Sequence, residues 1–194
     1  DSKSVESICA MEDILVEAND GSALSYLSGR PHAIGPFINV YSEDTLSFLA
    51  SKGAIHVTLP PELPSDAIAT LGKKARELGV TLETQVYGRI PLALSTRCYH
   101  ARAHGHVKDT CQFVCEQDPD GMVLKTLKNE SFLTINGIQT LSHSCLNLLN
   151  ELNELKTLGV NAFRLSPHNH DMIQTTLLYR DVLDGKISAS EASS

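Results

Sequence analysis

The sequence predicts an α/β fold in which short buried strands alternate with amphipathic helices. Gly29, Gly53 and Gly79 recur 24 and 26 residues apart, and each follows a helix-like segment and precedes an apolar run. Glycine favours the left-handed conformation just past a helix C-terminus, so this spacing indicates repeated helix ends. We therefore expect a chain of β–α units with a nearly constant length.

Three helices are predicted from apolar stripes at helical spacing. Ser42 is expected to cap the first, because Glu43 and Asp44 follow it and acids favour a helix N-terminus. Ser65 is expected to cap the second, and the third is expected to end at Gly159. The stripes are Leu46, Leu49 and Ala50; Ile68, Leu71, Ala75 and Leu78; and Leu148, Leu152 and Leu155.

Six apolar runs between turn signals have the length typical of buried parallel strands. They are Ile14–Ala18, Ala33–Val40, Ile55–Leu59, Val80–Tyr87, Phe132–Ile135 and Ala162–Leu165. A complete eight-stranded barrel needs about 250 residues. We expect residues 1–194 to form a single domain, a partial TIM-like (β/α) barrel of about six of eight units. Because the sequence begins with Asp1 and not with Met, we expect the chain to be truncated at its N-terminus. A six-stranded open doubly wound sheet is the alternative.

Residues 89–130 interrupt this repeat and are predicted to form an irregular, cysteine-bearing insertion. The segment holds Cys98, Cys111 and Cys115 and a strong turn signal over Asp118–Gly121. Long irregular insertions in compact domains are usually functional or disordered. The number of ligand-type residues here favours a functional segment.

The overall composition excludes several classes of protein. A net charge of −7 and a pI near 5.6 give no basic surface for nucleic acid. The sequence has no apolar run of the roughly 20 residues that a membrane-spanning helix needs, and no visible signal peptide. Three of the five cysteines fall within eighteen residues, which favours metal ligation in a reducing compartment, and we expect a cytoplasmic protein.

The cysteine spacing, Cys98-x12-Cys111-x3-Cys115, predicts a metal centre. Soft thiolates suit zinc or an iron–sulfur cluster, and a [4Fe–4S] cluster normally takes four of them. The fourth ligand stays open from the residues alone. It lies outside the chain, or it is Cys9, or Cys145 at the start of the third predicted helix, although both are expected to be small buried hydrophobes. A histidine from the same segment would instead complete a zinc site; the candidates are His100, His104 and His106.

Polar residues near the predicted strand ends are further candidates for a site. Arg164 stands within an apolar strand, where it is expected either to bind a carboxylate or phosphate or to pair with a neighbouring acid. The complete set is Glu17, Asn19, Asn39, Glu62, Arg89, Asn136 and Arg164.

Several segments resemble one known family. They are Gly88–Arg102, Lys108–Cys115, Asn136–Thr140 and Arg164–Pro167, with Val16–Asp20 and Leu59–Leu63 in addition. Over nearly the whole chain the sequence is similar to the UbiV family of the collagenase-like peptidase superfamily. The cysteine spacing is the most specific part of this resemblance.

The resemblance implies a TIM-barrel protein that binds a [4Fe–4S] cluster through four cysteines. Cys98, Cys111 and Cys115 match three of these ligands, and the fourth is expected to lie outside this chain, so we expect weaker cluster binding here, with zinc as the alternative. The resemblance also implies a heterodimer with a UbiU-like protein and a UbiT-like lipid-binding accessory protein. The implied role is oxygen-independent hydroxylation of a quinone precursor in anaerobic ubiquinone biosynthesis.

Two other functions stay open. A collagenase-like peptidase would fit the superfamily, although the sequence contains no HExxH motif and no Ser–His–Asp signature. A non-catalytic, metal-stabilised partner subunit would need the metal only to order the insertion.

Overall fold

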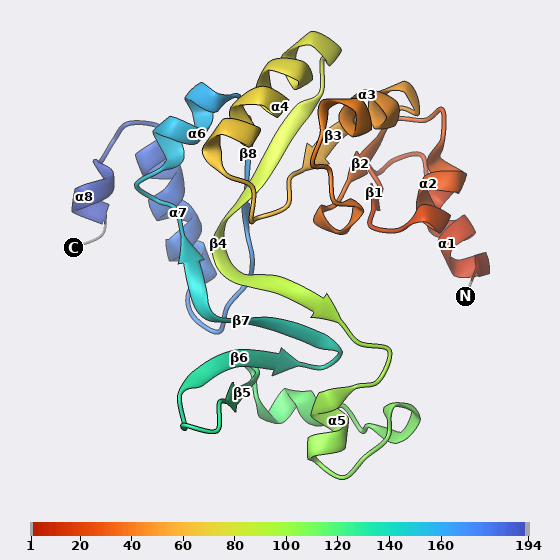
Figure 1. Cartoon of the computed structure of the whole chain (residues 1–194), viewed down its shortest axis with the longest axis vertical. Coiled ribbons are helices and arrows are strands. Elements are labelled where there is room, and N and C mark those ends of the chain that lie inside the picture. Colours follow the sequence, from red (N-terminus) through yellow and green to blue (C-terminus); the bar gives the residue numbers. More distant parts are fainter. Residues whose placement is uncertain (1, 193–194) are drawn as a thin grey trace. The chain divides into compact units, whose positions relative to one another are not determined.

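The computed structural model describes residues 2–192 and shows a mixed α/β chain that divides into two compact units (Figure 1). Unit 1 comprises the residues up to Val86 together with Asn150–Arg164. Unit 2 comprises Tyr87–Leu149 and the residues after Arg164. Strand β4 (Thr81–Leu94) contributes its first residues to unit 1 and the rest to unit 2.

A parallel sheet forms the centre of unit 1. Its strands are β1 (Glu17–Ala18), β2 (His32–Ile34), β3 (Ala54–Thr58) and the first part of β4, each parallel to the next. Strand β8 (Ala162–Leu165) pairs with β4. The order β1-β2-β3-β4 follows the chain without a switch point, as in the wall of a (β/α) barrel and unlike a doubly wound sheet.

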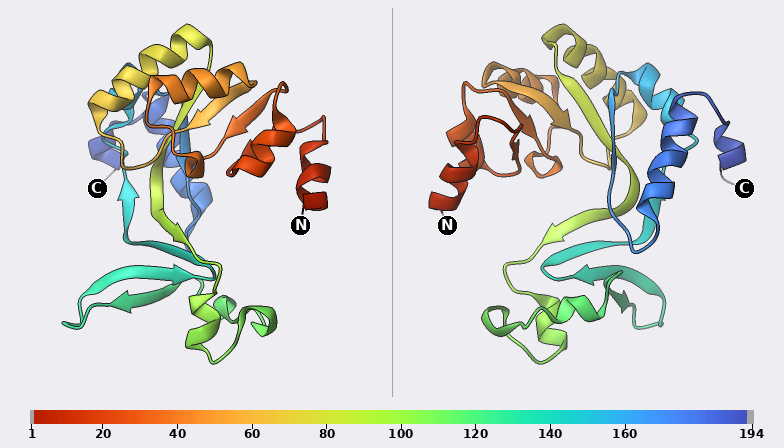
Figure 2. Two further views of the ribbon diagram at one scale, coloured as in Figure 1. Left: turned by 45° about the vertical axis from the view of Figure 1, so that its right-hand side comes forward. Right: turned by 180° about the vertical axis from the view of Figure 1, so that it is seen from behind.

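Helices precede or connect these strands. They are α1 (Ser2–Cys9), α2 (Gly21–Leu27), the short 3-10 helix η1 (Pro36–Ile38), α3 (Glu43–Ser51), α4 (Ser65–Leu78) and α6 (Leu152–Leu158). Helix α4 packs against both α3 and α6, and α3 and α4 lie side by side over one face of the strands (Figure 2). Gly29, Gly53 and Gly79 all have positive φ, which confirms the predicted helix ends.

Strand register divides the sheet into an apolar and a polar face. Ala18, Ile34, Val57 and Leu82 are aligned across β1 to β4, and each is 0% exposed. Aligned residues of neighbouring strands face the same side and successive residues alternate. Because Glu83 follows Leu82, it lies on the face opposite this buried row.

Unit 2 is built on an antiparallel sheet. From Tyr87 onward β4 pairs with β7 (Gln139–Asn147), β7 pairs with β6 (Ser131–Asn136), and β6 pairs with β5 (Met122–Lys125). Before β5 the chain forms α5 (Tyr99–Ala103) and the 3-10 helices η2 (Lys108–Thr110) and η3 (Val114–Gln117). Helices α7 (Met172–Leu183) and α8 (Ala189–Ala192) complete the unit.

The predicted parallel strand Phe132–Ile135 is wrong in direction. It lies within β6, which is antiparallel to both of its neighbours. Only Gly137 and Ile138 separate β6 from β7, whereas a parallel connection needs about a dozen residues or more. Asn136-Gly137 is a strong hairpin signal, and Gly137 has the positive φ that such turns use.

The helix predictions are partly confirmed. Ser42 caps α3 by accepting a hydrogen bond from the Thr45 backbone N–H, as expected. Helix α4, in contrast, is preceded by Pro64 at the N-cap, so Ser65 is its first helical residue and not its cap. At the other end of α4, Leu78 is 37% exposed, so it does not belong to the buried stripe in which it was predicted.

The longest helix among the described residues is α4, with 14 residues. A helix needs about 20 apolar residues to cross a bilayer. None of the helices that the structure describes is long and apolar enough to do so.

Candidate functional site

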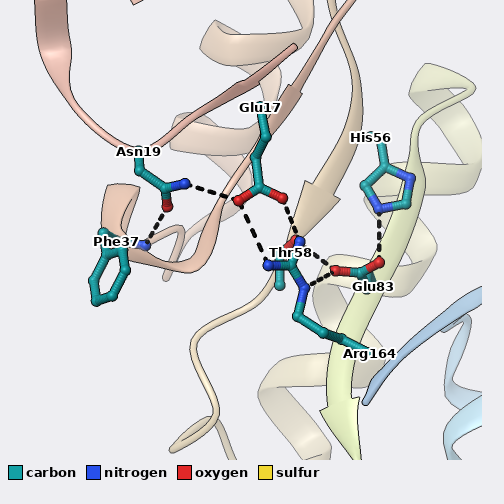
Figure 3. Close-up of polar contacts among 7 residues, drawn as sticks. All are labelled: Glu17, Asn19, Phe37, His56, Thr58, Glu83 and Arg164. Atoms are coloured by element: carbon teal, nitrogen blue, oxygen red, sulfur yellow. Dashed lines mark hydrogen bonds and ion pairs between the residues drawn. The ribbon is translucent and has the colours of Figure 1, made fainter. Parts of the chain in front are cut away.

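A charged cluster occupies the polar face of the unit 1 sheet (Figure 3). Arg164 on β8 donates from Nε to Glu83 Oε1 at 2.5 Å, and its Nη2 donates to Glu17 Oε2. The same Nη2 donates to Thr58 Oγ1 at 3.2 Å. The guanidinium therefore joins β1, β3, β4 and β8 through one side chain.

The carboxylates at either end of this cluster have additional partners. Glu83 accepts from Thr58 Oγ1 at 2.9 Å and lies 3.3 Å from His56 Nε2. Glu17 accepts from Asn19 Nδ2 at 2.8 Å, which places Asn19 in the same cluster. Each charged group of the cluster is hydrogen-bonded on more than one side.

Burial and pairing have opposite effects on the pKa values of this cluster. Burial alone would raise the pKa of Glu17, but hydrogen bonds from Arg164 and Asn19 outweigh it and the pKa lies below its usual range. Burial would likewise lower the pKa of Arg164, and its bonds to the two glutamates raise it instead. Glu17 and Arg164 are therefore both held ionised at neutral pH.

Arg164 was expected either to bind a ligand's anion or to pair with an acid, and the structure shows pairing. Two carboxylates accept hydrogen bonds from this guanidinium, so its charge is already paired within the protein. The cluster is best explained as a brace that holds the curled polar face of the sheet.

The other polar residues predicted near strand ends lie elsewhere. Glu62 accepts a hydrogen bond from the Tyr41 hydroxyl, and Asn39 adopts a left-handed conformation after η1. In unit 2, Arg89 donates to the backbone oxygens of Ser142 and His143, and Asn136 ends β6. Of the seven predicted residues, the structure brings Glu17, Asn19 and Arg164 together.

The three predicted cysteine ligands all lie in one segment of unit 2. Cys98 is the N-cap of α5, and its Sγ accepts from the Ala101 backbone N–H at 3.4 Å. Cys111 follows η2, and Cys115 lies within η3, which packs against α5. All three are free thiols of intermediate exposure, so they are accessible to an incoming ion.

The backbone between Cys111 and Cys115 adopts an unfavourable conformation. Gln112 and Phe113 are consecutive non-glycine residues with φ of 52° and 53°. The left-handed region costs an L-residue roughly 1–2 kcal/mol. Because the Phe113 side chain is 70% exposed, its own burial does not offset this cost. Conformations of this kind cluster at ligand-binding sites.

The two remaining cysteines differ from each other. Cys9, at the end of α1, is 3% exposed, which confirms the predicted small buried hydrophobe. The same prediction is wrong for Cys145, which is exposed. It lies opposite Arg89 on β7, not at the start of a helix, because the run Gln139–Asn147 pairs with strands on both sides.

Two of the three predicted histidines meet an acid that the sequence did not single out as a ligand. The Nε2 atoms of His100 and His104 lie 2.8 Å and 3.4 Å from Asp118 Oδ2. His106 is not part of this group. The spacing of the two histidines, four residues apart, was the signal available in the sequence; the contact with Asp118 depends on how α5 and η3 pack.

A comparison with known protein families decides the broader assignment: residues 25–194 match peptidase family U32. The chain belongs to peptidase family U32. The match covers Arg164 and the whole cysteine segment of this U32 protein, whereas Glu17 and Asn19 lie before it.

Proposed function

We propose that this U32 protein is an iron–sulfur subunit that holds a [4Fe–4S] cluster through Cys98, Cys111 and Cys115. We further propose that it acts with a UbiU-like partner in the oxygen-independent hydroxylation of a quinone precursor during anaerobic ubiquinone biosynthesis. A UbiT-like lipid-binding protein is the proposed accessory. The family match supports the class of protein, and the sequence motifs shared with the UbiV family support the specific role.

The observation that carries the cluster proposal is the turn between Cys111 and Cys115. Gln112 and Phe113 adopt left-handed backbone conformations there, and neither residue buries its own side chain to stabilise that conformation. A group bound by the flanking thiolates would stabilise that turn from outside. The three free, part-exposed thiols within one segment fit the donor set of such a cluster.

Ligand spacing distinguishes a cluster from a single ion. Thiolates of a [4Fe–4S] cluster each bind a different iron atom, so they lie farther apart than the ligands of one ion. The close group that the described residues form is His100, His104 and Asp118, without any of the three sulfurs. Iron, sulfide and zinc content therefore distinguish a cluster from a zinc ion at the cysteines.

The cluster would supply one-electron transfer when bound. The protein's own residues set its surroundings. Cys98 fixes the start of α5 through its bond from Ala101, and Arg97 beside it adds an exposed positive charge that offsets the negative charge of the thiolates. The fourth ligand is proposed to come from outside the residues described.

Anaerobic reconstitution with iron and sulfide tests this proposal. We expect iron and sulfide in equal amounts, up to about four of each per chain. We also expect a broad absorption at about 400 nm. Cys111→Ala should abolish the absorption, whereas Cys145→Ala, which removes an exposed thiol on β7, should leave it unchanged. Uptake of one zinc and no iron by the unaltered chain would contradict the proposal.

Peptide hydrolysis is the second candidate, because the family is named for it. His168 lies 3.2 Å from Asp120, an arrangement by which an acid can orient a catalytic histidine. Cleavage of a collagen-derived peptide that is lost in His168→Ala and retained in Cys111→Ala would favour this activity. Hydroxylation assays with a UbiU-like partner that depend on Cys111 would favour the first proposal.

A further inference from the structure

We infer that His100, His104 and Asp118 form a binding site for one divalent transition-metal ion, separate from the three thiolates. Their ligand atoms all lie within 4.8 Å of one another. The two Nε2 atoms converge on the same oxygen, Asp118 Oδ2, at 2.8 Å and 3.4 Å. An ion placed between these three atoms would replace the two hydrogen bonds with coordinate bonds.

Local structure positions the two histidines for this role. His100 lies in α5 and His104 is its C-cap, so the rings project from successive turns on one side. The rings are stacked, with centroids 5.3 Å apart and planes 8° from parallel. Two histidines four residues apart on one helical face are an established arrangement for binding zinc.

The third ligand comes from a separate element of the same unit. Asp118 is the C-cap of η3, and η3 packs against α5. The Asp118 backbone N–H donates to the Cys115 carbonyl oxygen at 3.2 Å. This bond fixes the backbone from which the Asp118 carboxylate extends. The site is thus assembled by packing and does not depend on a single flexible loop.

The three ligand side chains differ in how deeply they are buried. The His100 side chain is 0% exposed, and its Nδ1 is buried without a partner among the described residues, so Nε2 makes the only polar contact that holds the ring. His104 and Asp118 are 30% and 35% exposed. An ion can therefore enter beside His104 and settle against the buried ring.

The donor set selects the class of ion. Two imidazole nitrogens with one carboxylate oxygen suit Zn²⁺, Co²⁺ or Fe²⁺, whereas Mg²⁺ and Ca²⁺ prefer oxygen alone. Three protein ligands also leave a coordination position for water or another small ligand. The ion would be bound whether or not the neighbouring thiolates hold a cluster.

A cobalt titration separates this site from the thiolates. The probe is Co²⁺ added to the chain carrying Cys98→Ser, Cys111→Ser and Cys115→Ser, because serine preserves the cap of α5. We expect one Co²⁺ per chain, with weak visible bands and no thiolate-to-cobalt charge transfer. His104→Ala in the same background should weaken binding at least about tenfold, since it removes a direct ligand. Asp118→Asn should weaken it as well.

His106→Ala is the matched control, because His106 lies in the same segment but outside the group. It should bind Co²⁺ as tightly as the triple-serine chain. The inference is overturned if that chain takes up no Co²⁺, or if His104→Ala and His106→Ala bind alike. It is also overturned if Co²⁺ binds only when the cysteines are present, because the histidines would then belong to the thiolate site. Iron and sulfide uptake by the unaltered chain is measured independently of each of these results.

Discussion

The polar cluster around Arg164 and the segment Cys98–Asp118 both contain several ionisable side chains. They differ in how fully those side chains are paired. In the first, the guanidinium lies between Glu17 and Glu83, and each of these groups has a partner of opposite charge. In the second, free thiols are part-exposed, and His100 has a buried nitrogen without a described partner. A fully paired cluster stabilises the fold, whereas free, part-exposed thiols keep donor atoms available for a ligand.

Backbone conformation follows the same division. In the sheet of unit 1, a row of fully buried residues packs behind the polar cluster, and none of the four has positive φ. Between Cys111 and Cys115, the chain instead holds two non-glycine residues at positive φ. The comparison predicts that substitutions in the first region mainly reduce stability, and that some substitutions in the second region increase it.

The largest effect is expected from Gly72→Ala in α4. An added Cβ would lie 1.9 Å from the Leu158 carbonyl oxygen, so α4 and α6 would have to separate. We expect the free energy of unfolding to fall by about 3 kcal/mol, measured by urea denaturation. Gly21→Ala is the control: nothing lies within 4 Å of the added atom, and stability should change by less than about 1 kcal/mol. Equal effects would mean that unit 1 is not closely packed at α4.

Arg164→Met comes next, because it leaves Glu17 and Glu83 facing each other without a cation. We expect a loss of about 2 kcal/mol in unfolding free energy, less than for a fully buried pair because the side chain is 31% exposed. Arg180→Met is the control, since Arg180 is 65% exposed and 3.9 Å from Asp184; it should change stability by about 0.5 kcal/mol or less. If Arg164→Met were equally neutral, the brace interpretation would fail.

Phe113→Gly tests the opposite expectation for the cysteine segment. Glycine adopts positive φ without steric cost, so the metal-free protein should gain about 1 kcal/mol in unfolding free energy. The control is Phe132→Gly on β6, where the side chain is similarly exposed, at 60%, but the backbone is extended. That variant should lose stability. A loss in both would show that Phe113 is held by contacts and not by a bound group.

The smallest effect is a pH dependence at Glu17. Its pKa in the folded protein lies below the usual 4.5, so the stabilisation from its ionised form is fully present above pH 4.5. That stabilisation is lost as the pH falls through the lowered pKa. The stability difference between the wild type and Glu17→Gln should therefore be constant near neutral pH and narrow below pH 4.5. A difference that widens in acid would contradict the pairing with Arg164.

The sequence predicted unit 1 better than the antiparallel sheet of unit 2. The strand Ala162–Leu165 has the predicted bounds, and Ser42 caps α3 as expected. These features depend on local signals, namely a short apolar run and a side-chain oxygen before a helix. Strand β7 was missed because Gln139–Asn147 mixes polar and apolar residues, and its pairing with β4 joins segments far apart in sequence.

The candidate sites divide in the same way. Arg164 was identified as an unusual charge within an apolar strand, but its partner Glu83 was not, since the strand register that places it beside Thr58 is a tertiary property. The spacing of the cysteines was visible in the sequence, whereas the contact of His100 with Asp118 was not. Asp118 lies eighteen positions after His100, beyond the 3-10 helices η2 and η3, and no local pattern predicts how this segment folds back.

The ion pair between Glu17 and Arg164 also sets an order of events during synthesis. The two residues are 147 positions apart, and Arg164 follows the whole of Tyr87–Leu149 along the chain. At about 5–20 residues per second, a ribosome needs roughly 4–16 s to travel from Glu83 to Arg164. Throughout that interval the first four strands carry two carboxylates without their guanidinium and lack β8 at the edge of β4. A nascent chain that pauses there presents an incomplete sheet with an unpaired edge at β4.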